Sequence, residues 1–136
     1  MTQDWIDLIQ ASACSLIVGR DAVPTRTFQG RGINDLYHLF RQEPDVLHRA
    51  QLADKIVGKA AASLMVLAQV HEVYAAVISL PAWQMLEAAG IPTTCGVKVP
   101  HIINRQGTGL CPLETRCQHC NTPQECLAEI QAFLTK

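Results

Sequence analysis

The chain has 136 residues, a formal net charge of −1 and no run of basic residues. Extended nucleic-acid surfaces depend on clustered lysine and arginine, so a nucleic-acid polymer is not expected as a partner. No apolar run approaches the roughly 20 residues that span a bilayer, and residues 1–10 contain two aspartates but no positive segment. We therefore expect a cytoplasmic protein without a membrane span or signal peptide. Its six cysteines are expected as free thiols or metal ligands rather than disulfides.

Aromatic residues make up only 5% of the chain, so Leu, Ile, Val and Ala must build the core. This composition is typical of an α/β protein with alanine-rich helices packed closely on a sheet. The length is that of one domain, and no repeat or linker divides the chain. We expect a single domain over residues 1–136, with residues 1–14 as an N-terminal extension or helix.

The first half of the chain predicts a helix, a β-hairpin and a second helix. Residues 5–9 have amphipathic helical spacing, and two short β-like runs at 15–18 and 25–28 flank a turn. Asn34 is suited to start a helix that ends near Pro44. Residues 46–52 fit either a strand or the approach to the next helix. We favour the strand, because parallel topologies alternate strand and helix.

The second half contains the clearest unit of the chain. A β-branched strand at 73–78, a helix between Ser79 and Gly90, and a strand at 91–99 form a βαβ unit. Residues 100–121 predict an ordered loop with one helical turn. Thr122-Pro123-Gln124-Glu125 is a capping box that begins a final helix.

The segment Ala53–Ala62 joins the two halves and predicts the start of a central helix from about Asp54 to Ala68. On such a helix Lys55 and Lys59 are like-charged neighbours near the positive end, and Gly58 costs about 1 kcal/mol relative to alanine. These costs indicate a binding site.

Lysines and backbone N–H groups at a helix start bind phosphate or carboxylate, and Asp54 would orient a hydroxyl or accept a proton. Alternatively, Asp54 is only a cap, the lysines are solvated and Gly58 permits close packing. The segment is not a Walker motif, because G-x-x-x-x-G-K-[ST] is absent.

A second candidate is the segment Asn104–Glu114. Its Gly-Thr-Gly run allows the backbone to approach a ligand, Arg105 suits an anion, and Cys111 before Pro112 suggests a thiol at a helix start. The alternative is a glycine-rich turn with an inert thiol. The candidate ligand-binding residues of this segment are Asn104, Arg105, Gly107, Thr108 and Gly109.

The C-terminal cysteines have the spacing C-x5-C-x2-C-x5-C over Cys111, Cys117, Cys120 and Cys126. Cys117 and Cys120 suit zinc or an iron–sulfur cluster, and they are the candidate metal ligands. A second close pair is missing, and Cys126 falls on an apolar position of the last helix. The alternative is therefore a set of reduced thiols.

Three segments together resemble a prokaryotic family known as domain of unknown function 1893. They are Ala-Asp-Lys-Ile-Val-Gly-Lys-Ala-Ala-Ala at 53–62, Val-Tyr-Ala-Ala-Val-Ile-Ser at 73–79, and Ile-Ile-Asn-Arg-Gln-Gly-Thr-Gly-Leu-Cys-Pro-Leu-Glu at 102–114. The resemblance runs from about Ser15 to near the C-terminus. It implies a cytidine deaminase-like fold, a three-layer α/β/α sandwich around a mixed sheet, and a superfamily that commonly forms oligomers.

The resemblance does not extend to deaminase chemistry, which needs H-x-E or C-x-E on one helix and P-C-x-x-C on the next. The matching positions fall near Asp54–Ile56 and at Pro81–Met85, where Ala82 and Met85 replace both cysteines. We expect no catalytic zinc at the usual deaminase position. Asp54, Lys55 and Lys59 would then lie in the former pocket.

We therefore expect a small-molecule-binding protein on a zinc-free deaminase-like fold. Its ligand would be anionic, such as a nucleotide or a phosphorylated metabolite, and no cofactor is identified. One alternative is an enzyme that uses Cys111 as a reactive thiol and Asp54 as a base. Another is a metal-binding module built on Cys117 and Cys120.

Overall fold

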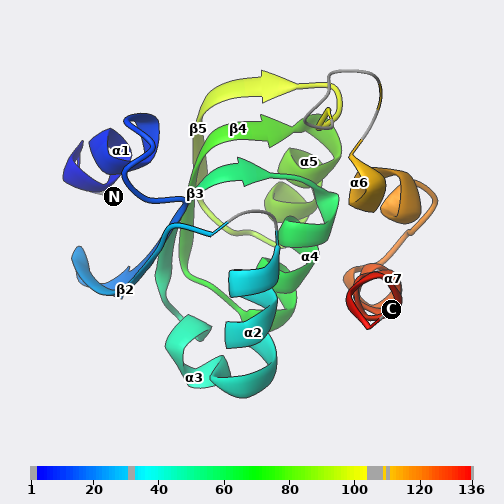
Figure 1. The fold of residues 1–136 in the computed structure, drawn as a ribbon, viewed down its shortest axis with the longest axis horizontal. Helices are drawn as coiled ribbons and strands as arrows, with labels where there is room; N and C mark the ends of the chain where they lie inside the picture. Colours follow the sequence, from blue (N-terminus) through cyan, green and yellow to red (C-terminus); the bar gives the residue numbers. More distant parts are fainter. Residues whose placement is uncertain (1–2, 31–32, 104–108, 110, 136) are drawn as a thin grey trace.

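A mixed five-stranded sheet forms the centre of the molecule (Figure 1). The computed structural model describes residues 3–30, 33–103, 109 and 111–135. The order across the sheet is β2-β1-β3-β4-β5, in which β1 is antiparallel to both neighbours and β3, β4 and β5 are parallel. The strands are β1 (Leu16–Arg20), β2 (Val23–Phe28), β3 (Gln51–Val57), β4 (Glu72–Ser79) and β5 (Thr93–Val99).

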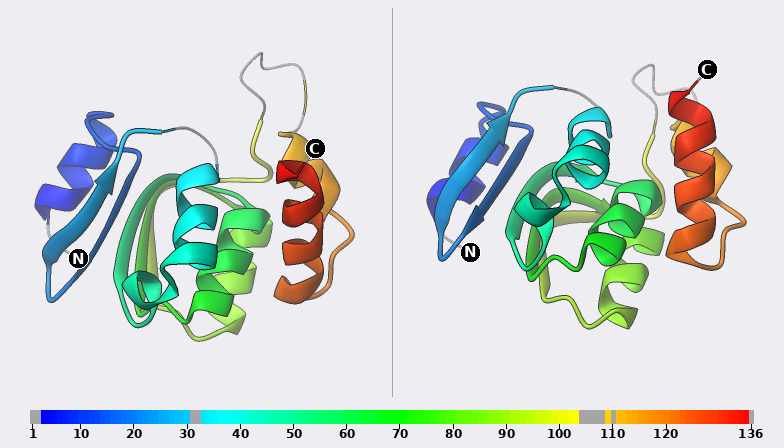
Figure 2. Two further views of the ribbon diagram at one scale, coloured as in Figure 1. Left: turned by 60° about the horizontal axis from the view of Figure 1, so that its bottom comes forward. Right: turned by 90° about the horizontal axis from the view of Figure 1, so that it is seen from below.

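Helices cover both faces of this sheet unequally, which gives the three layers expected from the resemblance (Figure 2). On one face α1 (Gln3–Gln10) packs over β3 and β4 through a small core around Trp5, Ile9 and Tyr74. The opposite face carries the main core, and α7 packs against α4. The remaining helices are α2 (Asn34–Gln42), α3 (Pro44–Leu47), α4 (Lys59–Ala68), α5 (Leu80–Ala88), α6 (Pro112–Cys117) and α7 (Pro123–Leu134). None of the described helices is long and apolar enough to cross a bilayer.

Most predicted elements are confirmed. The hairpin is present, with a tight turn at Asp21 and Ala22 whose φ values are 52° and 63°. Such positive values are typical of the type I′ turns that match the twist of a hairpin. Pro24 lies inside β2, which it can do because β2 is an edge strand. The βαβ unit and the capped C-terminal helix are also found.

The central helix begins later than predicted. Residues 51–57 form β3, which is paired on both sides, and the backbone N–H of Lys55 donates to the Ser15 carbonyl at 2.9 Å. Of the strand favoured at residues 46–52, residues 51 and 52 begin β3, whereas residues 46 and 47 end a short helix. The pairing of β3 with β1 on one side and with β4 on the other outweighs the helical preference of Asp54–Val57, which is a weak local preference.

This shift changes the interpretation of the central segment. Lys55 and Lys59 are not one helical turn apart, and Gly58 is the N-cap of α4 rather than an interior helical residue. The costs inferred from a continuous helix therefore do not arise. Asp54–Ile56, which the resemblance matches to the helical first deaminase motif, lie on β3 and not at the start of a helix.

Candidate functional site

The candidate site lies where the parallel strands β3 and β4 lead directly into α4 and α5. Gly58 separates β3 from α4, and Ser79 ends β4 at the N-cap of α5. In open α/β sheets, ligands bind beyond the carboxyl ends of parallel strands. The residues that cover this edge come from α6, α7 and the segment after β5.

Glu114 of α6 occupies the positive end of α4. Its carboxylate is buried and accepts hydrogen bonds from the backbone N–H groups of Lys59, at 2.8 Å, and Ile102, at 3.0 Å. A Cβ on Gly58 would lie 2.9 Å from Glu114 Oε1, so glycine is needed here for a close approach. The protein's own carboxylate thus fills the place at the helix N-terminus that the sequence analysis assigned to an anionic ligand.

The two lysines of the central segment have separate environments. Lys59 is half-buried, and its ammonium group donates to the carbonyl oxygen of Cys120 at 2.5 Å. Lys55 is an exposed residue of β3. An anionic small molecule bound by both lysines stays a prediction.

Asp54 lies on the central strand, opposite Leu16 of β1 and Ala75 of β4. Burial raises the pKa of its carboxyl from 3.8 to about 7, although the backbone N–H groups of Ile56 and Lys55 act in the opposite direction. A carboxyl with such a pKa gains and loses a proton near neutrality. Its proposed role as a base for Cys111 stays a prediction.

Three thiols come together at the junction of α6 and α7. The Sγ atoms of Cys117, Cys120 and Cys126 all lie within 4.8 Å of one another. Cys117 ends α6, Cys120 lies in the following turn and Cys126 lies in the first part of α7. The C-x2-C spacing predicts Cys117 and Cys120 as metal ligands, and the apolar helical position of Cys126 left open whether it belongs to the core.

The electrostatics of the three thiols are coupled through hydrogen bonds. A hydrogen bond from Cys117 lowers the pKa of Cys126 to about 6, with further support from Ser63, Cys120 and the charge of Lys59. The same bond raises the pKa of Cys117, and burial raises the pKa of Cys120 to about 11. The coupling therefore favours ionisation of Cys126 over ionisation of Cys117 and Cys120.

Ser63 and Met85 border the thiols on the side of α4 and α5. The Ser63 hydroxyl lies 2.8 Å from the Lys59 carbonyl oxygen and 3.1 Å from Met85 Sδ. Met85 stands where the resemblance places the second cysteine of P-C-x-x-C. Ser63 thus lies between the three-thiol cluster and Met85.

The other predicted residues are only partly described. Cys111 is the N-cap of α6 and is half-buried, and its backbone N–H donates to the Ile102 carbonyl at 2.9 Å. Gly109 is exposed. Asn104, Arg105, Gly107 and Thr108 lie outside the described residues, so their ligand-binding role stays a prediction.

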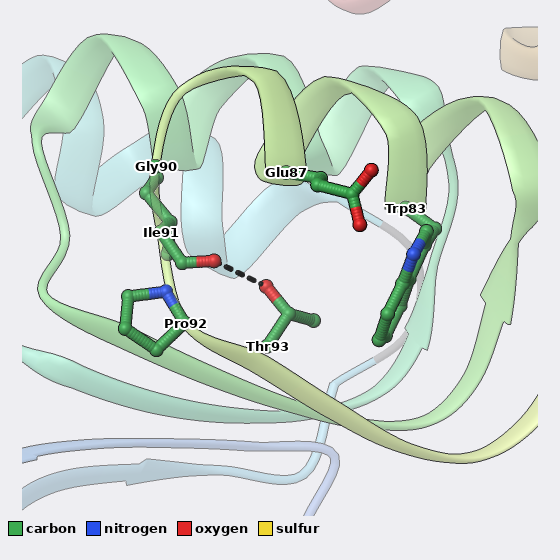
Figure 3. A pocket seen from close by; sticks show the side chains of 6 residues that line it. All are labelled: Trp83, Glu87, Gly90, Ile91, Pro92 and Thr93. Atoms are coloured by element: carbon green, nitrogen blue, oxygen red, sulfur yellow. Dashed lines mark hydrogen bonds between the residues drawn. The ribbon is translucent and has the colours of Figure 1, made fainter.

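The described residues form at least two surface hollows. An apolar groove of about 450 Å³ lies at the carboxyl ends of the strands, and its lining includes Ile56, Val77, His101 and Ile103. His101 Nδ1 is 3.9 Å from the Glu114 carboxylate, which links this groove to the α4 cap. A second hollow of about 300 Å³ lies between α5 and the start of β5 (Figure 3), beside Trp83 and Thr93. Neither hollow is lined by predicted site residues, but His101 joins the groove to the Glu114 cap of α4, so we place the functional site at the carboxyl ends.

Comparisons with known proteins agree with this fold. The family model for the domain of unknown function DUF1893 (TM1506) matches residues 5–134. A DUF1893 family protein from Thermotoga maritima (TM1506) has a similar crystal structure, with a TM-score of 0.85, 22% identity, and coverage of 98% of this chain and 92% of that one. RibD from Acinetobacter baumannii matches with a TM-score of 0.50 and 16% identity, over 68% of this chain and 33% of that protein. No curated protein matches the chain.

Proposed function

The chain belongs to the DUF1893 family, and from that premise we propose that it is a metal-binding protein. Its metal ligands would be the thiolates of Cys117, Cys120 and Cys126. The observation that carries this proposal is the convergence of three sulfur atoms within 4.8 Å. Thiolates are the ligands that zinc and other soft or borderline ions prefer in proteins.

The separation of the sulfurs suits one metal ion. A Zn–S bond of about 2.3 Å places the sulfurs of a tetrahedral site roughly 3.8 Å apart. The upper limit of 4.8 Å between the thiols therefore leaves about 1 Å of closure on binding. Side-chain rotation and a small shift of the α6–α7 turn can supply this movement.

The position of the cluster gives metal binding a structural consequence. Cys117 belongs to α6, whose Glu114 caps α4, and Cys126 belongs to α7, which packs against α4. An ion held by both helices would link α6 to α7 and so hold both of them against α4 and the sheet. Metal binding would then add to the stability of the folded protein, because the unfolded chain has no preformed site.

Cobalt substitution tests the proposal. Anaerobically reduced protein titrated with Co²⁺ should take up one ion per chain and develop an intense thiolate-to-cobalt absorption band in the near ultraviolet. Cys126→Ser and Cys120→Ser should lose the band, with circular dichroism to confirm folding. The matched control is Cys95→Ser, which changes a half-buried thiol on β5 and should behave as wild type. A folded, reduced wild type without the band would refute metal binding.

A further inference from the structure

We infer that a metal ion in the three-thiol cluster keeps a fourth coordination position beside Lys59, and that this position accepts a small anion. The inference rests on the proposed metal binding and names the ligand class of that site. It would give the centre an exchangeable position that a purely structural site lacks, since structural zinc sites are closed by four protein ligands.

The number of ligands is the first argument. Among the described residues, the group that could hold a metal here contains three members, Cys117, Cys120 and Cys126. His119 lies between two of them in sequence but is exposed and outside this group. Zinc and cobalt prefer four ligands in thiolate sites, so a fourth must come from outside this set.

The bordering polar side chain is already engaged. Ser63 has one hydroxyl proton, and its oxygen lies 2.8 Å from the Lys59 carbonyl oxygen and 3.1 Å from Met85 Sδ. Recruiting Ser63 as a ligand would cost its hydrogen bond to a buried backbone carbonyl. The described surroundings therefore favour an external fourth ligand.

Burial indicates the direction from which this ligand arrives. Cys117 and Cys126 are fully buried, whereas Cys120 and Lys59 are half-buried. The hydrogen bond from the Lys59 ammonium group to the Cys120 carbonyl holds these two residues together. Solvent thus reaches the cluster on the side where Lys59 places its charge.

Charge indicates what kind of ligand fits. A divalent ion with three thiolates has a net charge of minus one, which the Lys59 ammonium group neutralises. An anionic fourth ligand then leaves the site at minus one instead of minus two. Because uncompensated charge is costly in a half-buried site, Lys59 lowers the cost of binding an anion at the fourth position.

The test uses the Co²⁺-loaded protein with azide as an anionic probe and imidazole as a neutral probe. Both should shift the visible absorption bands of the wild type. Lys59→Met should weaken azide binding about tenfold, the equivalent of about 1.4 kcal/mol, and leave imidazole within about twofold. Lys59→Arg, which keeps the charge, should retain most of the azide affinity. Lys59→Gln serves if the Met variant does not fold.

Each result separates the two proposals. Uptake of Co²⁺ with bands that neither probe changes means that the protein fills the fourth position; the inference then fails and metal binding stands. Equal weakening of azide and imidazole in Lys59→Met means that Lys59 only supports the cluster, which overturns the anion part. Absence of Co²⁺ uptake overturns the proposed function itself.

Discussion

Two neighbouring strand–helix units, β3–α4 and β4–α5, have the same architecture but different local chemistry. The strands are parallel, and the register pairs Val57 with Ile78, so Gly58 and Ser79 take equivalent places just before their helices. Ser79 caps α5 with its own hydroxyl, which accepts from the Ala82 N–H at 3.3 Å. Gly58 has no side chain, and α4 is instead capped by Glu114, from a helix far along the chain.

The two strands differ in the same way. Asp54 of β3 pairs with Ala75 of β4, so a carboxyl stands in one unit where a methyl group stands in the other. The β4–α5 unit is therefore specified by its own residues, whereas β3–α4 is completed by distant parts of the fold. Substitutions at the caps of α4 and α5 and at Asp54 test this contrast.

The largest effect is expected from Glu114→Ala. The change leaves the N–H groups of Lys59 and Ile102 without their charged acceptor in a buried place, and should lower the free energy of unfolding by about 4 kcal/mol. Urea denaturation measures this loss. Glu129→Ala is the control, because Glu129 pairs with Arg116 at the surface and should cost less than about 1 kcal/mol. Similar losses in both variants would show that α4 does not depend on its distant cap.

The next largest effect is expected from Asp54→Asn, whose stability relative to the wild type should depend on pH. Because burial raises the pKa of Asp54 from 3.8 to about 7, the folded state retains a proton that the unfolded state loses in this interval. The wild type therefore loses stability as pH rises from about 4 to 7, and the loss is complete above pH 7.

Asn cannot ionise, so the variant should gain on the wild type over this range. The shift sets an upper limit of about 4 kcal/mol, and the partial exposure of Asp54 reduces the expected gain to about 2 kcal/mol. Thermal unfolding of both proteins at pH 4 and pH 8 gives the difference directly. A difference between variant and wild type that is flat with pH would contradict the raised pKa of Asp54.

The same contrast explains what the sequence could predict. The capping box at Thr122 and the Ser79–Pro81 start of α5 are local signals, and both helices begin where predicted. The hairpin and the βαβ unit follow from short-range periodicity. Asp54–Val57 carries no such signal, because its strand conformation depends on pairing with β1 and β4.

The candidate site was predictable to a smaller extent for a related reason. The C-x2-C spacing identified Cys117 and Cys120, whereas the apolar helical position of Cys126 left its assignment open between the cluster and the core. The five-residue spacing was a signal of mixed value, since the structure brings Cys126 in from α7 but leaves Cys111, at the same spacing on the other side, outside the cluster. Glu114 had no local signal, because its partners are backbone groups of two other segments.

A smaller effect is expected at Gly58. In Gly58→Ala the new Cβ would lie 2.9 Å from Glu114 Oε1 and 3.3 Å from Ile102 Cγ1, and displacing this fixed carboxylate should cost about 2 kcal/mol. Gly58→Ser creates the same crowding but supplies a hydroxyl cap like that of Ser79, which should restore about 1 kcal/mol. Urea denaturation of the two variants measures the difference. A serine variant no more stable than the alanine variant would mean that α4 cannot accept a local cap.

The smallest effect is expected from Ser79→Ala, which removes the local cap of α5 and leaves the Ala82 N–H without its acceptor. The expected loss is about 1 kcal/mol, the usual cost of a missing N-cap side chain, and well below that of Glu114→Ala. Thr122→Ala provides a matched case, because the Thr122 hydroxyl accepts from the Glu125 N–H at 3.2 Å at the exposed start of α7. Urea denaturation should place the two alanine variants close together. A loss at Ser79 as large as that at Glu114 would mean that the β4–α5 unit is no more local than its neighbour.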